Sequence, residues 1–258
     1  MAAHSGAARA FTIPGAVAWL REVLASHASV HAWASARPGA HEMAGRGRVF
    51  SVPAPCPGPD RRSRWVVRHF RRGGAVAGLL GDRYLAVGTP RPEREARASV
   101  EARARGIPTP AVVAGVVYPA WPCYRADLVT EQLPGAADLA EVLFYPSDGR
   151  VPREEALIAT GRLVRALERA GVFHPDLNAK NVLITAEGDD VTAHLVDLDR
   201  CHVRPRGVTA PAYPMRRRLA RSLRKFEART IRRLTAAEWG ALARGWEQKP
   251  TRARGGPE

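Results

Sequence analysis

Three polar side chains in the second half of the chain have the types and the spacing that phosphoryl transfer requires. Asp176 and Asn181 lie five residues apart in the segment His-Pro-Asp-Leu-Asn-Ala-Lys-Asn, and Asp197 follows sixteen residues after Asn181. A carboxylate such as Asp176 can accept the proton of an attacking hydroxyl. An amide oxygen and a second carboxylate, here Asn181 and Asp197, are ligands that Mg²⁺ prefers. The pattern predicts a phosphoryl-transfer site with Asp176 as base and the other two as metal ligands.

Other polar residues around this triplet have supporting roles or roles that the sequence leaves open. We expect His174 to brace the loop through hydrogen bonds rather than to take part in the chemistry. If the loop is that of a kinase, we expect Asn178 and Lys180 to face the phosphoryl-transfer site. Asn178 is then a candidate substrate contact, and Lys180 either contacts the γ-phosphate of ATP or is simply exposed. Asp199 is either a further metal ligand or a partner of Arg200, and both interpretations stay open.

The flanking pattern predicts the elements that position these residues. A helical stretch over 153–170 precedes the loop, with an apolar face every third or fourth residue. Two apolar runs follow the loop, at 182–184 and 193–198, and the turn-forming residues at 187–190 between them predict a hairpin. The helical face consists of Leu157, Gly161, Val164 and Leu167.

The order of strand-like and helix-like segments predicts an α+β chain with a bilobal, protein-kinase-like fold. Strands before about residue 130 form a β-rich N-lobe, and helices after it form a mainly helical C-lobe. We expect an N-terminal extension with a short helix over 1–40, the N-lobe over 41–130 and the C-lobe over 131–258, with a hinge at 131–135. The expected strands lie at 49–52, 64–68, within 107–117 and at 124–130, and the expected helices at 17–24, 92–105 and 138–143.

The phosphates of a nucleotide also need cations from the N-lobe, yet no lysine precedes Lys180. Arg68 ends the predicted strand 64–68 and takes the place of a phosphate-anchoring lysine. Its planar, permanently charged fork can pair with a helix carboxylate, for which Glu95 is the best candidate; the alternative for Glu95 is a surface pair with a neighbouring arginine. Gly45 and Gly47 would let backbone N–H groups approach the phosphates.

The charge balance points to an anionic partner. The 258 residues contain 40 Lys and Arg against 25 Asp and Glu, for a net charge of +15. Such an excess fits nucleic acid, a phosphorylated sugar or an anionic membrane. Three widely spaced cysteines predict neither a disulfide framework nor a zinc site. No segment reaches the roughly 18 apolar residues of a membrane-spanning helix.

Nine of the cations crowd one stretch, from Met215 to Leu234, against a single acid, Glu227. An apolar stripe at helical spacing runs through the same stretch, so we predict a basic amphipathic helix. This helix is either a surface that binds anionic lipid or sugar, or an ordinary C-lobe helix with a solvated arginine face. Both interpretations can be true, because a buried apolar stripe leaves the arginine face outward. The stripe consists of Leu219, Leu223, Phe226, Thr230 and Leu234.

The sequence resembles the lipopolysaccharide-core (Kdo/heptose) kinase family over most of its length. The most specific stretches are the run Arg-His-Phe-Arg-Arg-Gly-Gly at 68–74 and the Asp-Leu-Asn-Ala loop at 176–179. Further matching stretches are Ala44–Gly47, Arg83–Leu85, Arg91 with Glu95, Gly106–Pro110, Tyr124–Leu128, Val196–Arg200 and Arg218–Lys225. The sequence departs from the family pattern at Pro175, Leu198 and Met215-Arg216, and the last departure bears on contacts with the acceptor.

This resemblance implies an ATP- and Mg²⁺-dependent kinase. Its acceptor would be a hydroxyl of a 3-deoxy-D-manno-octulosonic acid (Kdo) residue on a lipid A precursor. The protein would be peripheral, at the anionic cytoplasmic face of a bacterial inner membrane, and no nucleic acid is expected as a partner. Arg72 and Arg221 are then candidate acceptor contacts beside Asn178. Two alternatives remain: another acceptor, such as a heptose, a small sugar or a protein side chain, or a pseudokinase-like binding module on anionic membranes.

Overall fold

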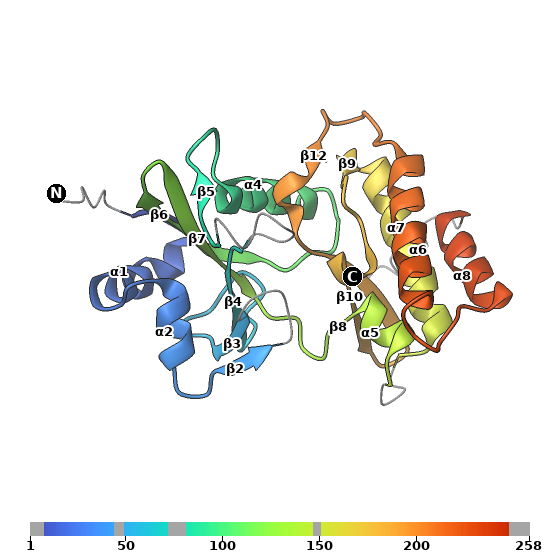
Figure 1. Cartoon of the computed structure of the whole chain (residues 1–258), viewed down its shortest axis with the longest axis horizontal. Helices are drawn as coiled ribbons and strands as arrows, with labels where there is room; N and C mark the ends of the chain where they lie inside the picture. The colour runs from blue at the N-terminus through green and yellow to red at the C-terminus, as the bar shows by residue number, and fades with distance from the viewer. Residues whose placement is uncertain (1–7, 44–48, 72–80, 147–150, 248–258) are drawn as a thin grey trace, which may run out of the picture. The chain divides into compact units, whose positions relative to one another are not determined.

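The chain divides into two units, and Figure 1 shows their helices and strands. The structure is a computed structural model that describes residues 8–43, 49–71, 81–146 and 151–247. The first unit comprises Met1–Val100 and Pro110–Leu133, and the second comprises Glu101–Thr109 and Pro134–Glu258. The first unit contains a large antiparallel sheet, whereas long helices dominate the second.

In the part of the first unit that the structure describes, the sheet has seven strands in the order β1-β6-β7-β4-β3-β2, with β5 paired to β7. Apolar and β-branched residues alternate along these strands, as in β4, where Trp65 and Val67 are fully buried. The strands expected near 49–52, 64–68 and 124–130, and the one within 107–117, are confirmed. The strands are β1 (Arg9–Thr12), β2 (His41–Met43), β3 (Val49–Pro53), β4 (Arg64–His69), β5 (Tyr84–Leu85), β6 (Val112–Ala120) and β7 (Cys123–Glu131).

Two helices, α1 (Val17–Ser26) and α2 (Val30–Ala36), follow the 3-10 turn η1 (Pro14–Ala16) and pack on this sheet. α1 confirms the short helix expected at 17–24. The side chain of Ser29 accepts a hydrogen bond from the Ala32 N–H at 3.0 Å and so begins α2. The sequence analysis missed both α2 and β1, and together they join the described part of the first 40 residues to the core of this unit.

A third helix, α4 (Arg91–Arg103), confirms the helix expected at 92–105. Its hydrophilic composition leaves few apolar side chains to bury, such as Ala98 and Ala102, and the polar Glu95 and Ser99 are buried as well. Its N-terminal part also carries Glu93, which pairs with Arg9 of β1 at 2.8 Å. The helix therefore lies where its carboxylates meet cations of the sheet.

Within its described residues, the second unit combines the four helices α5 to α8 with two small sheets. The predicted hairpin is confirmed as β10 paired with β11, with Glu187 opposite Asp190 and Gly188 at a φ of +59° in the turn. The helices expected at 138–143 and 153–170 are also confirmed. The elements are α5 (Leu139–Phe144), α6 (Arg153–Arg169), α7 (Ala212–Glu227), α8 (Ala236–Glu247), β8 (Ala137–Asp138), β9 (Val172–Phe173), β10 (Val182–Glu187), β11 (Asp190–Leu195), β12 (His202–Val203) and the 3-10 turns η2 (Ala179–Asn181) and η3 (Leu198–Arg200).

Two glycines let α6 and α8 pack with their backbones in contact (Figure 1). A β-carbon built on Gly161 would lie 2.7 Å from the α-carbon of Gly245, and one built on Gly245 would lie 2.3 Å from the carbonyl oxygen of Ile158. Any side chain at either position would therefore push the helices apart. The predicted apolar face of α6 is buried, and Gly161 is its point of closest contact.

The expected helix from Met215 to Leu234 is wrong in its C-terminal part, because α7 ends at Glu227. Residues 235–238 form a capping box: the Thr235 hydroxyl accepts from the Glu238 N–H at 3.2 Å, and the Glu238 carboxylate accepts from the Thr235 N–H at 2.7 Å. This local motif begins α8 and prevents one continuous helix. Thr230 and Leu234 thus lie outside α7, whereas Met215, Leu219 and Leu223 form its buried stripe. Among the described residues, no helix has the length and apolar character needed to cross a bilayer.

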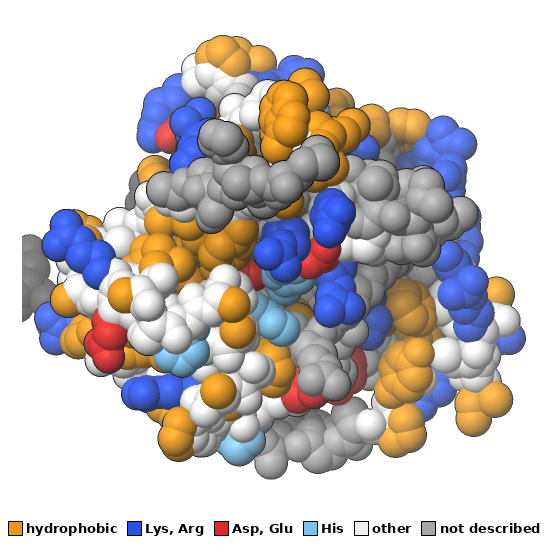
Figure 2. All heavy atoms as spheres, turned by 60° about the vertical axis from the view of Figure 1, so that its left-hand side comes forward, with side chains coloured by type: hydrophobic (Ala, Val, Ile, Leu, Met, Phe, Trp, Pro, Cys, Tyr) orange, Lys and Arg blue, Asp and Glu red, His pale blue; other side chains and the backbone are white. Residues whose placement is uncertain are grey.

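A buried polar network ties the sheet of the first unit together around Asp127, whose side chain is fully buried. One carboxylate oxygen lies 2.5 Å from Nδ1 of His69. The other accepts from the His31 N–H at 2.8 Å and from the Tyr118 hydroxyl at 2.9 Å. Asp82 lies 2.9 Å from Nε2 of His69. Histidine side chains lie beside acidic and basic ones near the middle of the face in Figure 2.

Two carboxylates on one imidazole favour its charged form. Burial by itself lowers the pKa of His69, but the hydrogen bonds and charges of Asp127 and Asp82 outweigh it, so this pKa lies above its usual value. A raised pKa means that protonated His69 stabilises the folded state at low pH. This stabilisation is complete below the unfolded pKa, about 6.5, and is lost as the pH rises through the folded-state pKa.

We predict that His69→Gln destabilises the protein most at low pH. Removing one partner of a buried ion pair costs on the order of 3 kcal/mol. Urea unfolding of both proteins between about pH 5.5 and 9 measures the difference, which should shrink as the pH rises. Asp82→Asn is the milder comparison, because the Asp82 side chain is 32% exposed. An equal difference at every pH would show that folding does not raise the pKa of His69.

Candidate functional site

The loop between β9 and β10 is closed by hydrogen bonds to one backbone carbonyl, that of Asp176. The side-chain amide of Asn178 donates to it at 2.8 Å and that of Asn181 at 3.2 Å. The amide oxygen of Asn178 also accepts from the Lys180 N–H at 2.9 Å, which caps η2. The spacing of these residues is therefore a structural requirement of the loop as well as a possible chemical one.

The two predicted metal ligands are joined through the backbone. The Val196 N–H donates to the Asn181 carbonyl at 3.0 Å, so Asp197 follows directly after a residue bonded to Asn181. Asp197 has a φ of +65°, a left-handed conformation that is costly for a residue with a side chain and is often found at functional sites. Because the amide nitrogen of Asn181 donates to Asp176, its amide oxygen remains as the ligand atom.

An amide oxygen and a carboxylate suit a hard cation such as Mg²⁺, so the residues present fit the predicted metal. Within the described ranges, no three His, Cys, Asp or Glu side chains converge as a metal site. A site with one asparagine and one aspartate does not need such a group, because Mg²⁺ usually keeps several waters and takes further oxygens from substrate phosphates.

His174 is buried against this loop, with 1% of its surface exposed. The ring Nδ1 of His174 accepts a hydrogen bond from the Asp176 backbone N–H at 3.2 Å. The backbone N–H of His174 donates to the Met215 sulfur at 3.5 Å. Burial lowers the pKa of His174, opposed by the charges of Asp197 and Asp176 and by the Val196 carbonyl. The ring is thus neutral with its proton on Nε2, and its contacts agree with the bracing role predicted for it.

The Asp176 carboxylate forms an ion pair that the sequence analysis missed. Its Oδ1 accepts from the guanidinium of Arg218, in α7. The same face of α7 offers the Ser222 hydroxyl to the Ala179 N–H at 3.2 Å. Arg218 lies 42 residues from Asp176 in the chain, and only the stretch Arg218–Lys225, noted for its family resemblance, could have drawn attention to it.

Lys180 is exposed, and its ammonium lies 2.8 Å from a carboxylate oxygen of Asp138. Asp138 also caps α5 by accepting from the Glu141 N–H at 2.9 Å. A contact of Lys180 with phosphate stays a prediction. Asp199 is 3% exposed within η3, and Arg221 is exposed on α7 about one turn after Arg218.

In the first unit the structure brings together the predicted pair of Arg68 and Glu95. The guanidinium at the end of β4 lies 2.5 Å from the Glu95 carboxylate in α4. Glu95 is 7% exposed and Arg68 is 30% exposed, so the pair is anchored on the carboxylate side and open on the guanidinium side. The guanidinium also lies over the Phe70 ring, 4.8 Å from its centre. Gly45, Gly47 and Arg72 lie outside the described residues.

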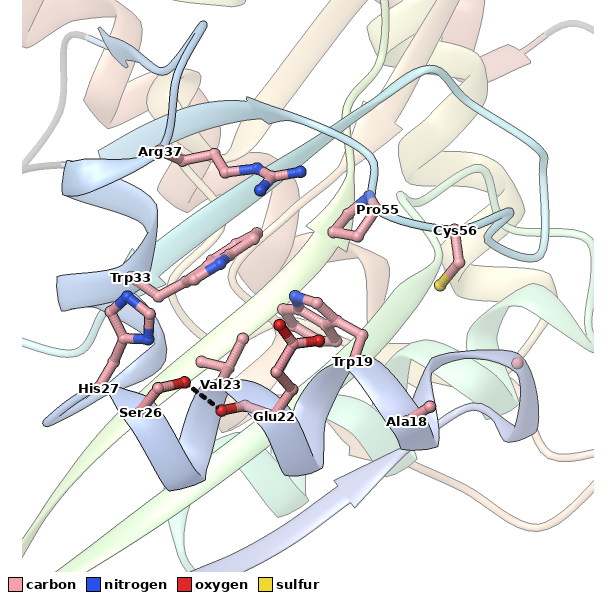
Figure 3. A pocket seen from close by; sticks show the side chains of 11 residues that line it. Ala18, Trp19, Glu22, Val23, Ser26, His27, Trp33, Arg37, Pro55 and Cys56 are labelled. Carbon is pink, nitrogen blue, oxygen red and sulfur yellow. Dashed lines mark hydrogen bonds between the residues drawn. The ribbon is translucent and has the colours of Figure 1, made fainter.

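A pocket of about 320 Å³ in the first unit is separate from these residues (Figure 3). It opens between α1, α2 and the loop after β3, and the rings of Trp19 and Trp33 line it with Arg37 beside them. None of the residues predicted to act in catalysis or binding lines it. Its walls include the core contact of Trp19 with Trp33, whose ring centres are 5.2 Å apart, so it is a hollow at the edge of the core.

The structure is similar to the solved structure titled "WaaP in complex with acyl carrier protein", with a TM-score of 0.52 and 19% identity, covering 94% of this chain and 90% of that one. This likeness confirms the predicted α+β, kinase-like fold class.

Residues 31–246 match the model of the Lipopolysaccharide kinase (Kdo/WaaP) family. The chain is 34% identical over 233 residues to a 3-deoxy-D-manno-octulosonic acid kinase of Xanthomonas oryzae pv. oryzae (strain PXO99A), covering 88% of this chain and 86% of that one. It is 31% identical over 207 residues to the enzyme of the same name from Stenotrophomonas maltophilia (strain K279a), covering 79% and 76%. The chain belongs to the Kdo/WaaP family and is a lipopolysaccharide kinase.

We predict that Arg68→Ala raises the KM for ATP on the order of tenfold, the usual effect of losing one charged hydrogen bond. The KM for the sugar acceptor should change less, because Arg68 is expected to hold the nucleotide. Steady-state kinetics with each substrate varied in turn measure both values. Arg97→Ala, an exposed arginine on α4, is the matched control. A larger rise in the KM for the acceptor than in the KM for ATP would show that Arg68 contacts the sugar.

Proposed function

We propose that this lipopolysaccharide kinase transfers the γ-phosphoryl group of ATP to a hydroxyl of a Kdo residue on a lipid A precursor. The observation that carries the acceptor is the name shared by relatives that match most of the chain at 31–34% identity. The observation that carries the chemistry is the closed loop that holds Asp176, Asn178 and Asn181 on one carbonyl.

Asp176 acts as the general base in this proposal. Its carboxylate accepts the proton of the acceptor hydroxyl while the hydroxyl oxygen forms a bond to the γ-phosphorus. The bond from that phosphorus to the β–γ bridging oxygen breaks, and ADP leaves with the electron pair. His174 keeps the loop in place as a neutral ring. Most of the rate enhancement in phosphoryl transfer comes from positioning of the reactants and stabilisation of charge.

Asn181 and Asp197 would hold Mg²⁺, which neutralises charge on the phosphates when it is bound. Arg68, oriented by Glu95, supplies the cation that a lysine supplies elsewhere. Lys180, Gly45 and Gly47 are the further proposed contacts to the nucleotide. The proposed contacts to the acceptor are Arg72, Asn178 and Arg221.

An acceptor screen is the experiment that tests the proposal. The purified protein, ATP and Mg²⁺ are incubated with a Kdo-bearing lipid A precursor, a heptosylated core and a protein substrate, and phosphate incorporation is measured for each. Phosphorylation of the Kdo acceptor supports the proposal. Transfer only to heptose or protein would replace the acceptor, and no ATP turnover with any of them would favour a binding module.

We also propose that α7 and the residues after it hold the enzyme at an anionic membrane surface. The apolar stripe of α7 is buried, and Arg217, Arg224 and Lys225 are exposed on its surface. An Arg near an anionic surface contributes about 1 kcal/mol. A few such residues give reversible attachment that depends on salt, which suits a kinase with a lipid-linked acceptor.

We predict that Arg217, Arg224 and Arg229 changed together to Glu release the protein from anionic vesicles. All three are exposed. Activity on a soluble, short-chain acceptor should be kept, because none of them is assigned to the site. Cosedimentation at about 50 to 500 mM salt, over which screening lengths fall severalfold, measures the binding. The same change at Arg21, Arg97 and Arg125 controls for net charge, and equal loss in both triple variants would contradict a specific surface.

We predict that Asp176→Ala lowers the rate of transfer by roughly 10²- to 10⁴-fold, the usual contribution of general-base catalysis. ATP binding should survive, because Asp176 is not assigned to the nucleotide. Single-turnover transfer and ATP titration separate the two effects. Near-normal transfer by this variant would remove Asp176 from the mechanism.

A further inference from the structure

Helix α7 is attached to the catalytic loop along one of its faces. Met215 contacts the His174 N–H at 3.5 Å, and Ser222 accepts from the Ala179 N–H at 3.2 Å. Arg218 lies between them on the same face and pairs with the Asp176 carboxylate. The spacings of three and four residues along a helix place these three side chains in one line. The loop and this face of α7 therefore form one site within the second unit.

The pairing of Arg218 places a cation where the acceptor must arrive. The acceptor hydroxyl has to reach the Asp176 carboxylate, and the guanidinium of Arg218 now bonds to one of its oxygens. The two side chains are 38% and 45% exposed, so an incoming molecule can reach both. Any acceptor that approaches Asp176 must also meet Arg218.

The surroundings of Arg218 are cationic. Glu227 is the only acid of α7, and its carboxylate accepts from the Leu234 N–H at 2.9 Å, beyond the end of the helix. Arg221 and Lys225 are exposed three and seven residues after Arg218 and so lie on the same side of α7. Arg216, in contrast, pairs with Glu168 of α6 at 3.2 Å. On its own helix, Arg218 therefore has cations beside it and no carboxylate in competition with Asp176.

We propose that Arg218 recognises the carboxylate of an acidic sugar acceptor and makes the enzyme selective for it. This inference rests on the proposed function, which supplies such an acceptor. When the acceptor binds, its carboxylate replaces that of Asp176 on the guanidinium. Arg218 exchanges one carboxylate partner for another, and Asp176 becomes available to the hydroxyl. A planar fork with several donors suits this exchange better than a point charge.

Selectivity follows from what happens with a neutral acceptor. An acceptor without a carboxylate must separate Arg218 from Asp176 and gives the guanidinium no new charged partner. A site that is left with an unpaired charged group rejects the wrong ligand. The enzyme should therefore discriminate against a Kdo acceptor whose carboxylate is converted to an amide, even though every hydroxyl is retained.

The test compares two acceptors, the Kdo-bearing lipid A precursor and its carboxyl-amidated form, by kcat/KM. The wild-type enzyme should prefer the acid on the order of 10- to 100-fold, as expected for one charge-assisted contact. Arg218→Ala should lose this preference: its kcat/KM falls on the acid and stays within about threefold of wild type on the amide. Arg218→Lys keeps the charge without the fork and should retain part of the preference.

Controls separate this role from a structural one. Arg169→Ala removes an exposed arginine of α6 that has no assigned role, and it should leave the preference unchanged. If Arg218→Ala lowers kcat/KM equally for acid and amide, or if the wild-type enzyme does not distinguish them, Arg218 is only a brace and the inference is wrong. Should Arg218→Ala fail to fold, Arg218→Lys with full preference would overturn it equally. Failure of the proposed function is a different result: the wild-type enzyme then phosphorylates neither Kdo acceptor.

Discussion

The second unit depends on one backbone carbonyl, that of Asp176, which accepts from the side chains of Asn178 and Asn181. These two bonds bend the loop so that Asp176 and Asn181 leave it as neighbours despite five residues of separation. The carbonyl of Asn181 then receives the Val196 N–H, which positions Asp197. The backbone around the proposed base and both proposed metal ligands is thus fixed by hydrogen bonds between uncharged groups.

In the first unit, a buried acid fixes the strand that carries Arg68. Asp127 ties β7 to β4, β6 and α2 through His69, Tyr118 and the N–H of His31. His69 directly follows Arg68, so the end of β4 is held on one side by this network and on the other by the pair with Glu95. The permanent charge of Arg68 is thereby presented from a rigid strand, which is what a phosphate contact requires.

Helix α7 serves two purposes with one composition. Its buried stripe of Met215, Leu219 and Leu223 docks the helix on the second unit. The arginines that remain divide between the catalytic loop, where Arg218 meets Asp176, and the outer surface. The excess of basic residues, which composition alone could assign only to an anionic partner, is thereby assigned to two proposed anions: the sugar acid and the membrane surface.

The sequence by itself determined the features that act over short range. Turn residues at 187–190 predicted the β10–β11 hairpin, and apolar, strand-like runs predicted β3, β4 and β7. The start of α8 is also encoded locally, in the capping box of Thr235 and Glu238, although the apolar stripe predicted one helix up to Leu234. These predictions succeed because local hydrogen bonds and side-chain periodicity depend on neighbours in the chain.

Only the tertiary structure decided the contacts between distant residues. Arg218 reaches Asp176 over 42 residues, His69 reaches Asp127 over 58, and Gly161 meets Gly245 where α6 and α8 cross. The pair of Arg68 and Glu95 was predicted as a candidate, but its geometry and burial were not. For one arginine among nine cations, or one glycine among 23, the neighbouring residues in the sequence do not indicate which residue it contacts. Its role follows from which surfaces the fold brings into contact, because ion pairs and close helix packing depend on distances in space.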